Sequence, residues 1–284
     1  MRLPGRAYGL VLLALVVPNA GPLRISTRPR PLHDHEPRDF VPIAENDFSR
    51  QPGWPPQWAG LRGQWWAFPT RNPNLAVVSV PNAPESPPYV LETRFPAGLS
   101  GGTEPVSLGG WDTGDVGTQY SSIYFAVWIR ILGDSYENQA VGTKLGFFGY
   151  ASARSRPQND GYLMLQGVGV QKVLRRSRLE FRQQGYTSRN LEPNVDRSLV
   201  MTVGSWHHVE LLMTLNRPGT ANGSLKLWVD GKRVLDYHDV VYVVPSAANG
   251  FQAYKWAPTW GGAGGIRSRS DAIQIDHIYI SGRR

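Results

Sequence analysis

Apolar and polar residues alternate in short segments along much of the chain. The clearest example is Ser121–Ile131, SSIYFAVWIRI. Residues two apart on a strand share a face, so this segment is predicted to be a strand with one face in the core. The predicted core face carries Ile123, Phe125, Val127 and Ile129. The opposite face carries Tyr124, Ala126, Trp128 and Arg130.

Further strand candidates follow at short intervals, with turn residues between them. They cover residues 87–95, 142–150, 161–169, 177–184, 205–216, 223–231, 232–240, 251–258 and 272–281. No amphipathic pattern of helical length stands out, and the chain contains 31 Gly and 23 Pro. This combination predicts an all-β fold, an antiparallel β-sandwich or jelly roll.

The segment from Gly204 to Tyr237 shows how such strands are joined. Alternation predicts one core set in its first strand and another in its second: Val209, Leu211, Met213 and Leu215, then Leu225, Leu227 and Val229. Asp230-Gly231 is the dipeptide of a tight hairpin turn, since both residues tolerate positive φ. Asp230 is therefore interpreted as part of the fold and is given no catalytic role.

The N-terminal region differs in composition from the rest. Arg2 and Arg6 precede the apolar run LVLLALVV, which is too short to span a bilayer as a helix. Residues 1–22 are therefore predicted to be a secretory signal peptide. Residues 23–44 are rich in Pro and Arg and are predicted to be a flexible linker. Residues 45–284 form the predicted globular domain. No later segment is apolar enough to be transmembrane, which predicts a secreted or cell-surface protein.

Composition narrows the possible functions. The formal net charge of +8 and a pI of about 9.8 favour an acidic partner. No nucleic-acid-binding motif is present, so a nucleic-acid partner is not expected. The absence of Cys excludes disulfides and thiolate metal sites. Glu180, Glu210 and Asp230 stand alone in their strands, which disfavours the paired carboxylates of a glycoside hydrolase.

Several of these segments together resemble a known family. GSWHHVELLMTLNRPGTANGSLKLWVDGKRV resembles the strand pair of concanavalin A-like lectin/glucanase jelly rolls, in particular the polysaccharide lyases of the alginate and glucuronan lyase type. LETRFPAG (residues 91–98), TKLGFFG (residues 143–149) and the closing WAPTWGGAGG and IQIDHIYIS are similar to further segments of that family. The resemblance covers roughly residues 45 to 281 and implies a concanavalin A-like jelly roll.

The resemblance also implies candidate catalytic residues. A lyase of this type cleaves a uronate-containing glycan by β-elimination, which needs a carboxylate-neutralising group, a base and an acid. By position, the resemblance assigns these tasks to Lys144, Arg94 and Tyr254, with Gln166 or Arg182 contacting a substrate carboxylate. The sequence also departs from the family. GYLMLQG lacks the Arg and the Tyr-x-Tyr expected after TKLGFFG, and the Gln-x-His motif of related alginate lyases is absent.

These departures favour binding without cleavage. The main hypothesis is an exported protein that binds an acidic polysaccharide on its concave sheet. Tyr124, Trp128 and Arg130 would supply stacking and a carboxylate contact, with Trp256 at the groove edge. The alternative is a polysaccharide lyase, and the second alternative is a cell-surface structural or adhesion protein. Whether the chain is an enzyme stays open at this stage.

A metal ion would have a structural role in this fold. No cofactor is required by either glycan hypothesis. Jelly rolls of this kind often hold one structural Ca²⁺ through oxygen ligands between the first and last strands. Asp47 and Asp276 stand at the corresponding ends of this sequence. The run His33-Asp34-His35-Glu36 could also bind a metal, although two His in a mobile linker lack fixed geometry.

Overall fold

The computed structural model describes residues 33–49, 66–68, 73–112, 119–133, 142–150, 160–167, 176–185, 187–246, 249–261 and 265–284. The predicted signal peptide, residues 1–22, lies outside these residues. Residues 31–284 belong to one compact unit. The described part of this unit consists of β-strands and turns, without an α-helix. It therefore contains no helix long and apolar enough to span a membrane.

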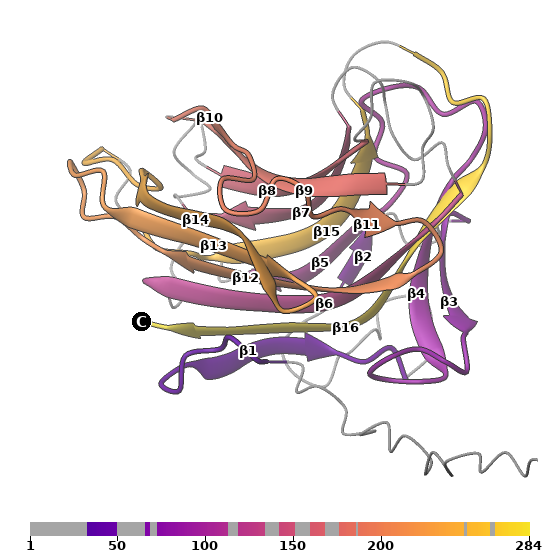
Figure 1. The fold of residues 1–284 in the computed structure, drawn as a ribbon, viewed down its shortest axis with the longest axis horizontal. Helices are drawn as coiled ribbons and strands as arrows, with labels where there is room; N and C mark the ends of the chain where they lie inside the picture. Colours follow the sequence, from indigo (N-terminus) through magenta and orange to yellow (C-terminus); the bar gives the residue numbers. More distant parts are fainter. Residues whose placement is uncertain are drawn as a thin grey trace, which may run out of the picture. The chain divides into compact units, whose positions relative to one another are not determined.

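The strands form two antiparallel sheets that face each other (Figure 1). Sheet A has the order β14-β13-β12-β6-β16-β4-β3, and β1 also pairs with β16. Its strands are β1 (Val41–Asn46), β3 (Leu75–Ser79), β4 (Tyr89–Phe95), β6 (Ser122–Leu132), β12 (Trp206–Thr214), β13 (Gly223–Val229), β14 (Lys232–Val240) and β16 (Asp271–Arg283).

Sheet B has the order β10-β9-β8-β7-β15-β5-β2, and β11 also pairs with β9. Its strands are β2 (Trp66–Phe68), β5 (Ser107–Asp112), β7 (Thr143–Gly149), β8 (Asp160–Gly167), β9 (Arg176–Gln184), β10 (Arg189–Leu191), β11 (Met201–Thr202) and β15 (Ala253–Trp260). The two sheets together confirm the predicted all-β jelly roll.

The hydrophobic core lies between the sheets. The alternating residues predicted to face inward belong to it, including Ile123, Phe125, Val127 and Ile129 from sheet A. Sheet B contributes Leu145 and Phe148 from β7, Leu163 and Leu165 from β8, and Leu179 and Phe181 from β9. Each sheet therefore has an outer face made of the intervening residues. The molecule presents two such faces, on opposite sides of the sandwich.

The predicted Asp-Gly turn is present between β13 and β14. Val229 pairs with Lys232, so Asp230 and Gly231 form a two-residue loop. Their φ angles are 53° and 76°, in the left-handed region that such a turn requires.

Part of the segment predicted to be a linker belongs to the fold. β1 pairs with β16, and residues 33–39, which we call the strap, lie on the outer face of sheet A. His35 donates its backbone N–H to Glu210 Oε1 at 3.0 Å, and its ring lies 4.4 Å from that of Trp228. The ring of His33 stacks on Tyr279 at 3.7 Å. These contacts show that the linker prediction for residues 33–44 is wrong. The segment has no hydrophobic periodicity, so its sequence gives no sign of the contacts.

Candidate functional site

The outer face of sheet B gathers polar and aromatic residues on three adjacent strands. On β8, Leu163 and Leu165 point into the core, so Tyr162 and Met164 point outward. The same alternation turns Arg178, Glu180 and Arg182 of β9 outward, on either side of core residues Leu179 and Phe181. On β7, a bulge between Lys144 and Phe147 brings both side chains to the outer face.

The strand register places these residues in two rows across the sheet. Lys144 pairs with Met164, which pairs with Glu180. Phe147 pairs with Tyr162, which pairs with Arg182. Neighbouring strands lie about 4.8 Å apart, so side chains in one row are within contact of each other. Lysine, tyrosine and arginine thus meet on one surface although they come from three separate segments of the sequence.

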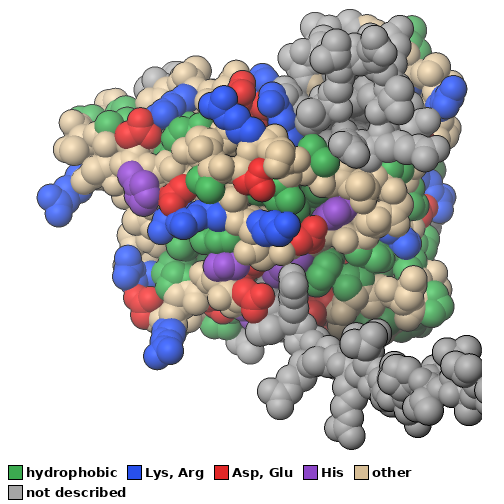
Figure 2. Space-filling view, viewed as in Figure 1, with side chains coloured by type: hydrophobic (Ala, Val, Ile, Leu, Met, Phe, Trp, Pro, Cys, Tyr) green, Lys and Arg blue, Asp and Glu red, His purple; other side chains and the backbone are tan. Residues whose placement is uncertain are grey.

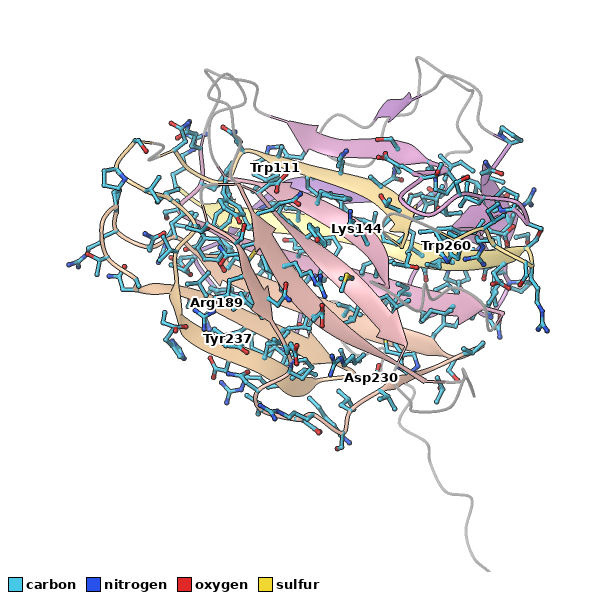
Figure 3. The ribbon with its side chains drawn as sticks, turned by 90° about the horizontal axis from the view of Figure 1, so that it is seen from above. Trp111, Lys144, Arg189, Asp230, Tyr237 and Trp260 are labelled. Atoms are coloured by element: carbon cyan, nitrogen blue, oxygen red, sulfur yellow. The ribbon has the colours of Figure 1, made fainter. Side chains whose placement is uncertain are left out.

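Two cations lie against the aromatic rings of this surface. Lys144 Nζ is 5.4 Å from the centre of the Tyr162 ring, and Figure 3 labels Lys144 on its strand. Lys255 Nζ is 5.0 Å from the centre of the Phe147 ring, and the Phe147 and Tyr162 rings are 5.3 Å apart. These distances fall within the range of cation–π attraction. The rings therefore hold both ammonium groups over the face of the sheet.

Glu180 organises the arginines of β9. Its side chain is buried, and Oε1 accepts a hydrogen bond from Arg182 Nε at 2.7 Å. Arg178 Nη2 lies 3.7 Å from Oε2. A buried carboxylate needs such partners because burial of an unpaired charge is costly. Arg182 also makes a hydrogen bond to the Tyr162 hydroxyl.

Burial raises the pKa of Tyr162 above its ordinary value of 10.0. The charge of Arg182 and its hydrogen bond to the phenol oppose this shift. Tyr162 is therefore protonated at neutral pH and can donate a proton. Burial also raises the pKa of Asp160, against the attraction of Lys255 and Lys144.

Two predicted site residues lie in the core instead. Tyr254 is 1% exposed and packs against Phe125 and Phe148, each ring centre 5.0 Å away. Trp256 is 2% exposed and donates its indole N–H to Thr93 Oγ1 at 3.0 Å. A glycan on the outside of either sheet cannot reach these groups. The placement of Tyr254 as a proton carrier and of Trp256 at a groove edge is therefore corrected.

The predicted binding row Tyr124, Trp128 and Arg130 lies on the outer face of sheet A. Tyr124 is fully buried there, and its hydroxyl donates to Glu210 Oε1 at 2.5 Å. Trp128 stacks on His208 at 4.9 Å, and Arg130 Nε donates to Gln274 Oε1 at 3.0 Å. The row is thus on the opposite side of the sandwich from Lys144 and Arg182. The predicted binding set is divided between the two faces, and Tyr124 is not accessible to a ligand.

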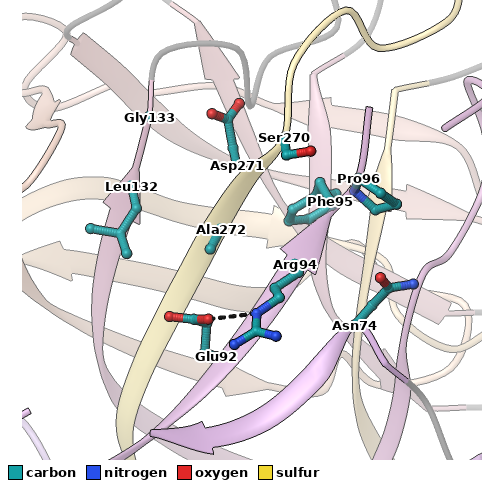
Figure 4. A pocket seen from close by; sticks show the side chains of 10 residues that line it. All are labelled: Asn74, Glu92, Arg94, Phe95, Pro96, Leu132, Gly133, Ser270, Asp271 and Ala272. Carbon is teal, nitrogen blue, oxygen red and sulfur yellow. Dashed lines mark hydrogen bonds and ion pairs between the residues drawn. The ribbon is translucent and has the colours of Figure 1, made fainter. Parts of the chain in front are cut away.

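Arg94 also lies on sheet A. Its exposed side chain lines a pocket of about 410 Å³ and pairs with Glu92 at 2.8 Å (Figure 4). Arg94 and Lys144 therefore cannot act on the same sugar unit, contrary to the joint role that the resemblance implies. The side chain of Gln166 lies outside the described residues, although its backbone pairs with Arg178.

The residues proposed for calcium are engaged in other contacts. The Asp47 carboxylate accepts hydrogen bonds from the backbone and hydroxyl of Ser49. The buried Asp276 carboxylate accepts hydrogen bonds from the Glu85 and Ser86 backbone N–H groups, at 2.8 and 3.1 Å, and from the Ser86 hydroxyl. Asp276 thus fixes the Glu85–Ser86 turn. The part of the chain that the structure describes holds no group of three or more side chains suited to a metal ion.

Tyr162 and Glu180 are the members of this candidate site that the sequence interpretation did not select. The signal for Tyr162 is present in GYLMLQG, where alternation with Leu163 and Leu165 places the tyrosine outside. The order Tyr254-Lys255-Trp256 also indicates that the aromatic residues point inward, since a lysine between them must point out.

Comparison with known proteins connects the chain to polysaccharide lyases. Residues 166–263, about a third of the chain, match the model of the polysaccharide lyase 14 family. No curated protein sequence matches the chain.

Solved structures of lyases share the fold. The alginate lyase Aly36B, as a double mutant in complex with an alginate trisaccharide, superposes with a TM-score of 0.58 and is 10% identical, covering 86% of this chain and 100% of that chain. The endo-β-1,4-glucuronan lyase from the fungus Trichoderma reesei gives a TM-score of 0.53 at 15% identity, covering 86% and 96%. The marine PL-14 alginate lyase from Aplysia kurodai gives 0.50 at 11%, covering 73% and 86%.

Proposed function

We propose that this concanavalin A-like jelly roll of the polysaccharide lyase type is a polysaccharide lyase that acts on the outer face of sheet B. The observation that carries the proposal is the meeting of Lys144, Tyr162 and Arg182 on that face. They supply an amine, a protonated phenol and a guanidinium, which are the group types that β-elimination at a uronate requires. The lyase folds of the solved relatives support it further.

The reaction needs no water and no redox partner. A base removes the proton on C5 of a uronate unit, next to its carboxylate. The electron pair of that C–H bond forms the C4=C5 double bond, and the bond between C4 and the glycosidic oxygen breaks. An acid then gives that oxygen a proton. The products are a new chain end with a hydroxyl and an unsaturated uronate conjugated with its carboxylate.

Each residue fits one of these tasks. Arg182, held from behind by Glu180, presents terminal nitrogens that can pair bidentately with the uronate carboxylate and stabilise the charge that develops on it. Tyr162 is protonated at neutral pH and can donate to the leaving oxygen. Lys144, whose Nζ lies across the Tyr162 ring, is assigned as the group that takes the C5 proton. This assignment replaces Tyr254 by Tyr162 and Arg94 by Arg182.

The substrate class follows from the same charges. Lys144, Lys255, Arg178 and Arg182 all belong to this face, which favours a polymer carrying carboxylates. Alginate and glucuronan are the first candidates, because the solved relatives are lyases for these two polymers. The proposal includes export directed by residues 1–22 as a signal peptide, followed by action on an extracellular polymer.

The test is the ultraviolet absorbance of the unsaturated uronate. The purified chain is incubated with alginate, glucuronan, pectate and glycosaminoglycans. We expect a rise in absorbance with one polymer, and a decrease in kcat of about 10²–10⁴-fold in Tyr162→Phe and in Lys144→Ala. Lys226→Ala, which removes a lysine from sheet A, is the matched control and should keep full activity. Activity that survives both site substitutions would contradict the assignment.

Binding without cleavage is the second candidate. It is favoured by one feature of β8, because Met164 stands two residues after Tyr162, where a Tyr-x-Tyr pair would have a second phenol. Its signature is retention of the protein in a gel that contains the polymer, with no rise in absorbance. A chain that is neither retained nor active on any polymer of the panel would refute both glycan proposals and favour a structural or adhesion role.

A further inference from the structure

A pocket lies on the other side of the sandwich from the proposed active site. It is formed where β4 ends and β16 begins, beside the end of β6, and has a volume of about 410 Å³. Figure 4 shows Glu92 and Arg94 side by side at one end and Ser270 and Asp271 at the other. Phe95, Pro96, Leu132 and Ala272 give it apolar walls. A wall of this kind suits the CH faces of a sugar ring, and the polar groups suit its hydroxyls.

A glycine makes room for one side of the pocket. Gly133 has φ of +89°, and a Cβ there would lie 1.9 Å from Asp271 Oδ1. The Asp271 carboxylate therefore occupies space that any larger residue would take, and it pairs with the buried Arg267 at 2.5 Å. This ion pair fixes the Asp271 carboxylate and offsets its charge. β6 and β16 thus approach each other closely at this wall of the pocket.

Arg94 is the group in this pocket that remains available for an anion. Its Nε donates to Glu92 Oε1 at 2.8 Å, and Gln274 Nε2 donates to Glu92 Oε2 at 2.8 Å. Glu92 therefore holds the guanidinium from one edge. Among the described residues, the terminal nitrogens of Arg94 have no hydrogen bond or ion pair, and the side chain is 50% exposed. A guanidinium with one free edge matches the two oxygens of a carboxylate.

We propose that this pocket binds a single uronate unit of the glycan, as a second site remote from the one that cleaves it. The carboxylate of the unit pairs with Arg94, and its ring lies against the apolar wall. Arg94 is paired with Glu92, and Arg267 is paired with Asp271, so the pocket has no large excess of positive charge. This balance suits one carboxylate better than a dense polyanion. The identity of the ligand rests on the proposed function, while the existence of the site rests on the pocket.

The location on the opposite face determines what such a site would do. A short oligosaccharide that fills the outer face of sheet B cannot also reach Arg94 on sheet A. A long polymer can occupy both sites at once, and the second contact then benefits from a high effective concentration. The site should therefore matter for polymers and be without effect on short substrates.

Substrate length provides the test. With alginate or glucuronan, whichever is cleaved, Arg94→Ala is expected to raise KM for the long polymer by about 3- to 10-fold and to leave kcat and KM for a tetrasaccharide unchanged. Ala272→Phe, which fills the pocket and keeps Arg94, should have the same effect. The matched control is Arg283→Ala, because Arg283 is also an exposed arginine of sheet A, 53% exposed and paired with Asp39. It should not change either substrate.

Two results would overturn the proposal. One is a polymer KM that is the same in Arg94→Ala and in the parent protein. The other is an equal loss on polymer and tetrasaccharide, which would assign Arg94 to the cleavage site or to folding. Retention of the Lys144→Ala protein in a gel containing the polymer, with and without Arg94→Ala, tests the same site without catalysis. A protein that shows no cleavage yet loses retention with Arg94→Ala would refute the lyase and support the second site.

Discussion

Tyr162 and Tyr254 show how the environment of a phenol decides what it can do. Burial raises the pKa of both. Tyr162 lies on the outer face of sheet B, where Arg182 contacts its oxygen and Lys144 lies across its ring. Tyr254 lies between the sheets, and its hydroxyl has no hydrogen-bond partner among the described residues. A buried hydroxyl without a partner is a cost to the fold rather than a tool for chemistry.

Removing the Tyr254 hydroxyl should therefore be harmless. We expect Tyr254→Phe to leave the free energy of unfolding unchanged or to raise it by up to about 1–2 kcal/mol, because an unsatisfied polar group leaves the core. Denaturation in urea measures this change. Cleavage should be unaffected, in contrast to Tyr162→Phe. A large loss of activity in Tyr254→Phe with intact stability would return the catalytic assignment to Tyr254.

At the scale of elements, the hairpin of β13 and β14 is held to its neighbour by Asp230, which Figure 3 labels. Asp230 Oδ2 is 2.8 Å from His207 Nδ1, and Oδ1 accepts the His208 backbone N–H at 2.9 Å. The Thr202 backbone N–H donates to His207 Nε2, so the proton of the neutral ring is on Nδ1. Asp230 thus ties the turn to the start of β12, which extends the structural role that the sequence indicates.

This turn should make part of the stability dependent on pH. Burial alone would raise the pKa of Asp230, but hydrogen bonds from His207 and His208 hold it below its ordinary value of 3.8. A depressed pKa stabilises the folded state above 3.8, and that contribution is lost as the pH falls through the lower folded pKa. We expect Asp230→Asn, which tolerates the turn, to cost about 1 kcal/mol at neutral pH, a low figure because the side chain is 38% exposed.

Urea midpoints at neutral pH and near pH 2 measure the effect. The difference between the parent protein and Asp230→Asn should shrink as the pH falls below 3.8 toward the lowered pKa of Asp230. An equal difference at both pH values would show that the charge of Asp230 does not contribute.

Alternation predicted the strands and their inner faces because burial against the other sheet imposes a period of two. It could not assign the outer faces. Each sheet of a sandwich has its own outside, and the sequence of Tyr124, Trp128 and Arg130 is compatible with either. Only the pairing of β6 with β12 and β16 places this row on sheet A, away from Lys144. Strand order arises from contacts between distant segments, which local patterns do not encode.

Only part of the candidate site was predictable, because local sequence patterns do not encode which strands are neighbours. Lys144 and Arg182 were selected by their positions in the family resemblance, Lys144 through its place in TKLGFFG. Tyr254 was preferred to Tyr162 because both are tyrosines in strands and the family resemblance carried no register, so the burial of Tyr254 between the sheets was not foreseen. The strap was missed since a segment such as His33–Asp39 has no period and is ordered only by the groups beneath it.

At the scale of the whole molecule, charge is distributed rather than concentrated. The formal net charge is +8, yet Figure 2 shows acidic and basic side chains interspersed over the face that it presents. Such a surface attracts a polyanion from a distance without fixing where it binds. Selection of the binding face then depends on local groups such as Arg182 and, on the other side, Arg94.

Long-range attraction of this kind is sensitive to salt. We expect the apparent affinity for an acidic polymer to fall by about 10-fold or more as ionic strength rises from about 0.05 to 0.5 M, because the screening length decreases from more than 10 Å to a few Å. Retention in polymer-containing gels at several salt concentrations measures it, and a neutral glucan serves as the control polymer. Affinity that does not change with salt would show that the net charge has no part in binding.

The pairing of β1 with β16 has a mechanical consequence. Val41, where β1 begins, lies opposite Gly282, one residue before the end of β16, so the two strands run antiparallel from one shared edge of the sheet. Tension applied to residues 41 and 282 would pull this pair apart from its open end, and the load would fall on one set of hydrogen bonds at a time. A domain tethered at both positions would therefore yield by unzipping β1 from β16, while the remaining strands of sheet A keep their partners.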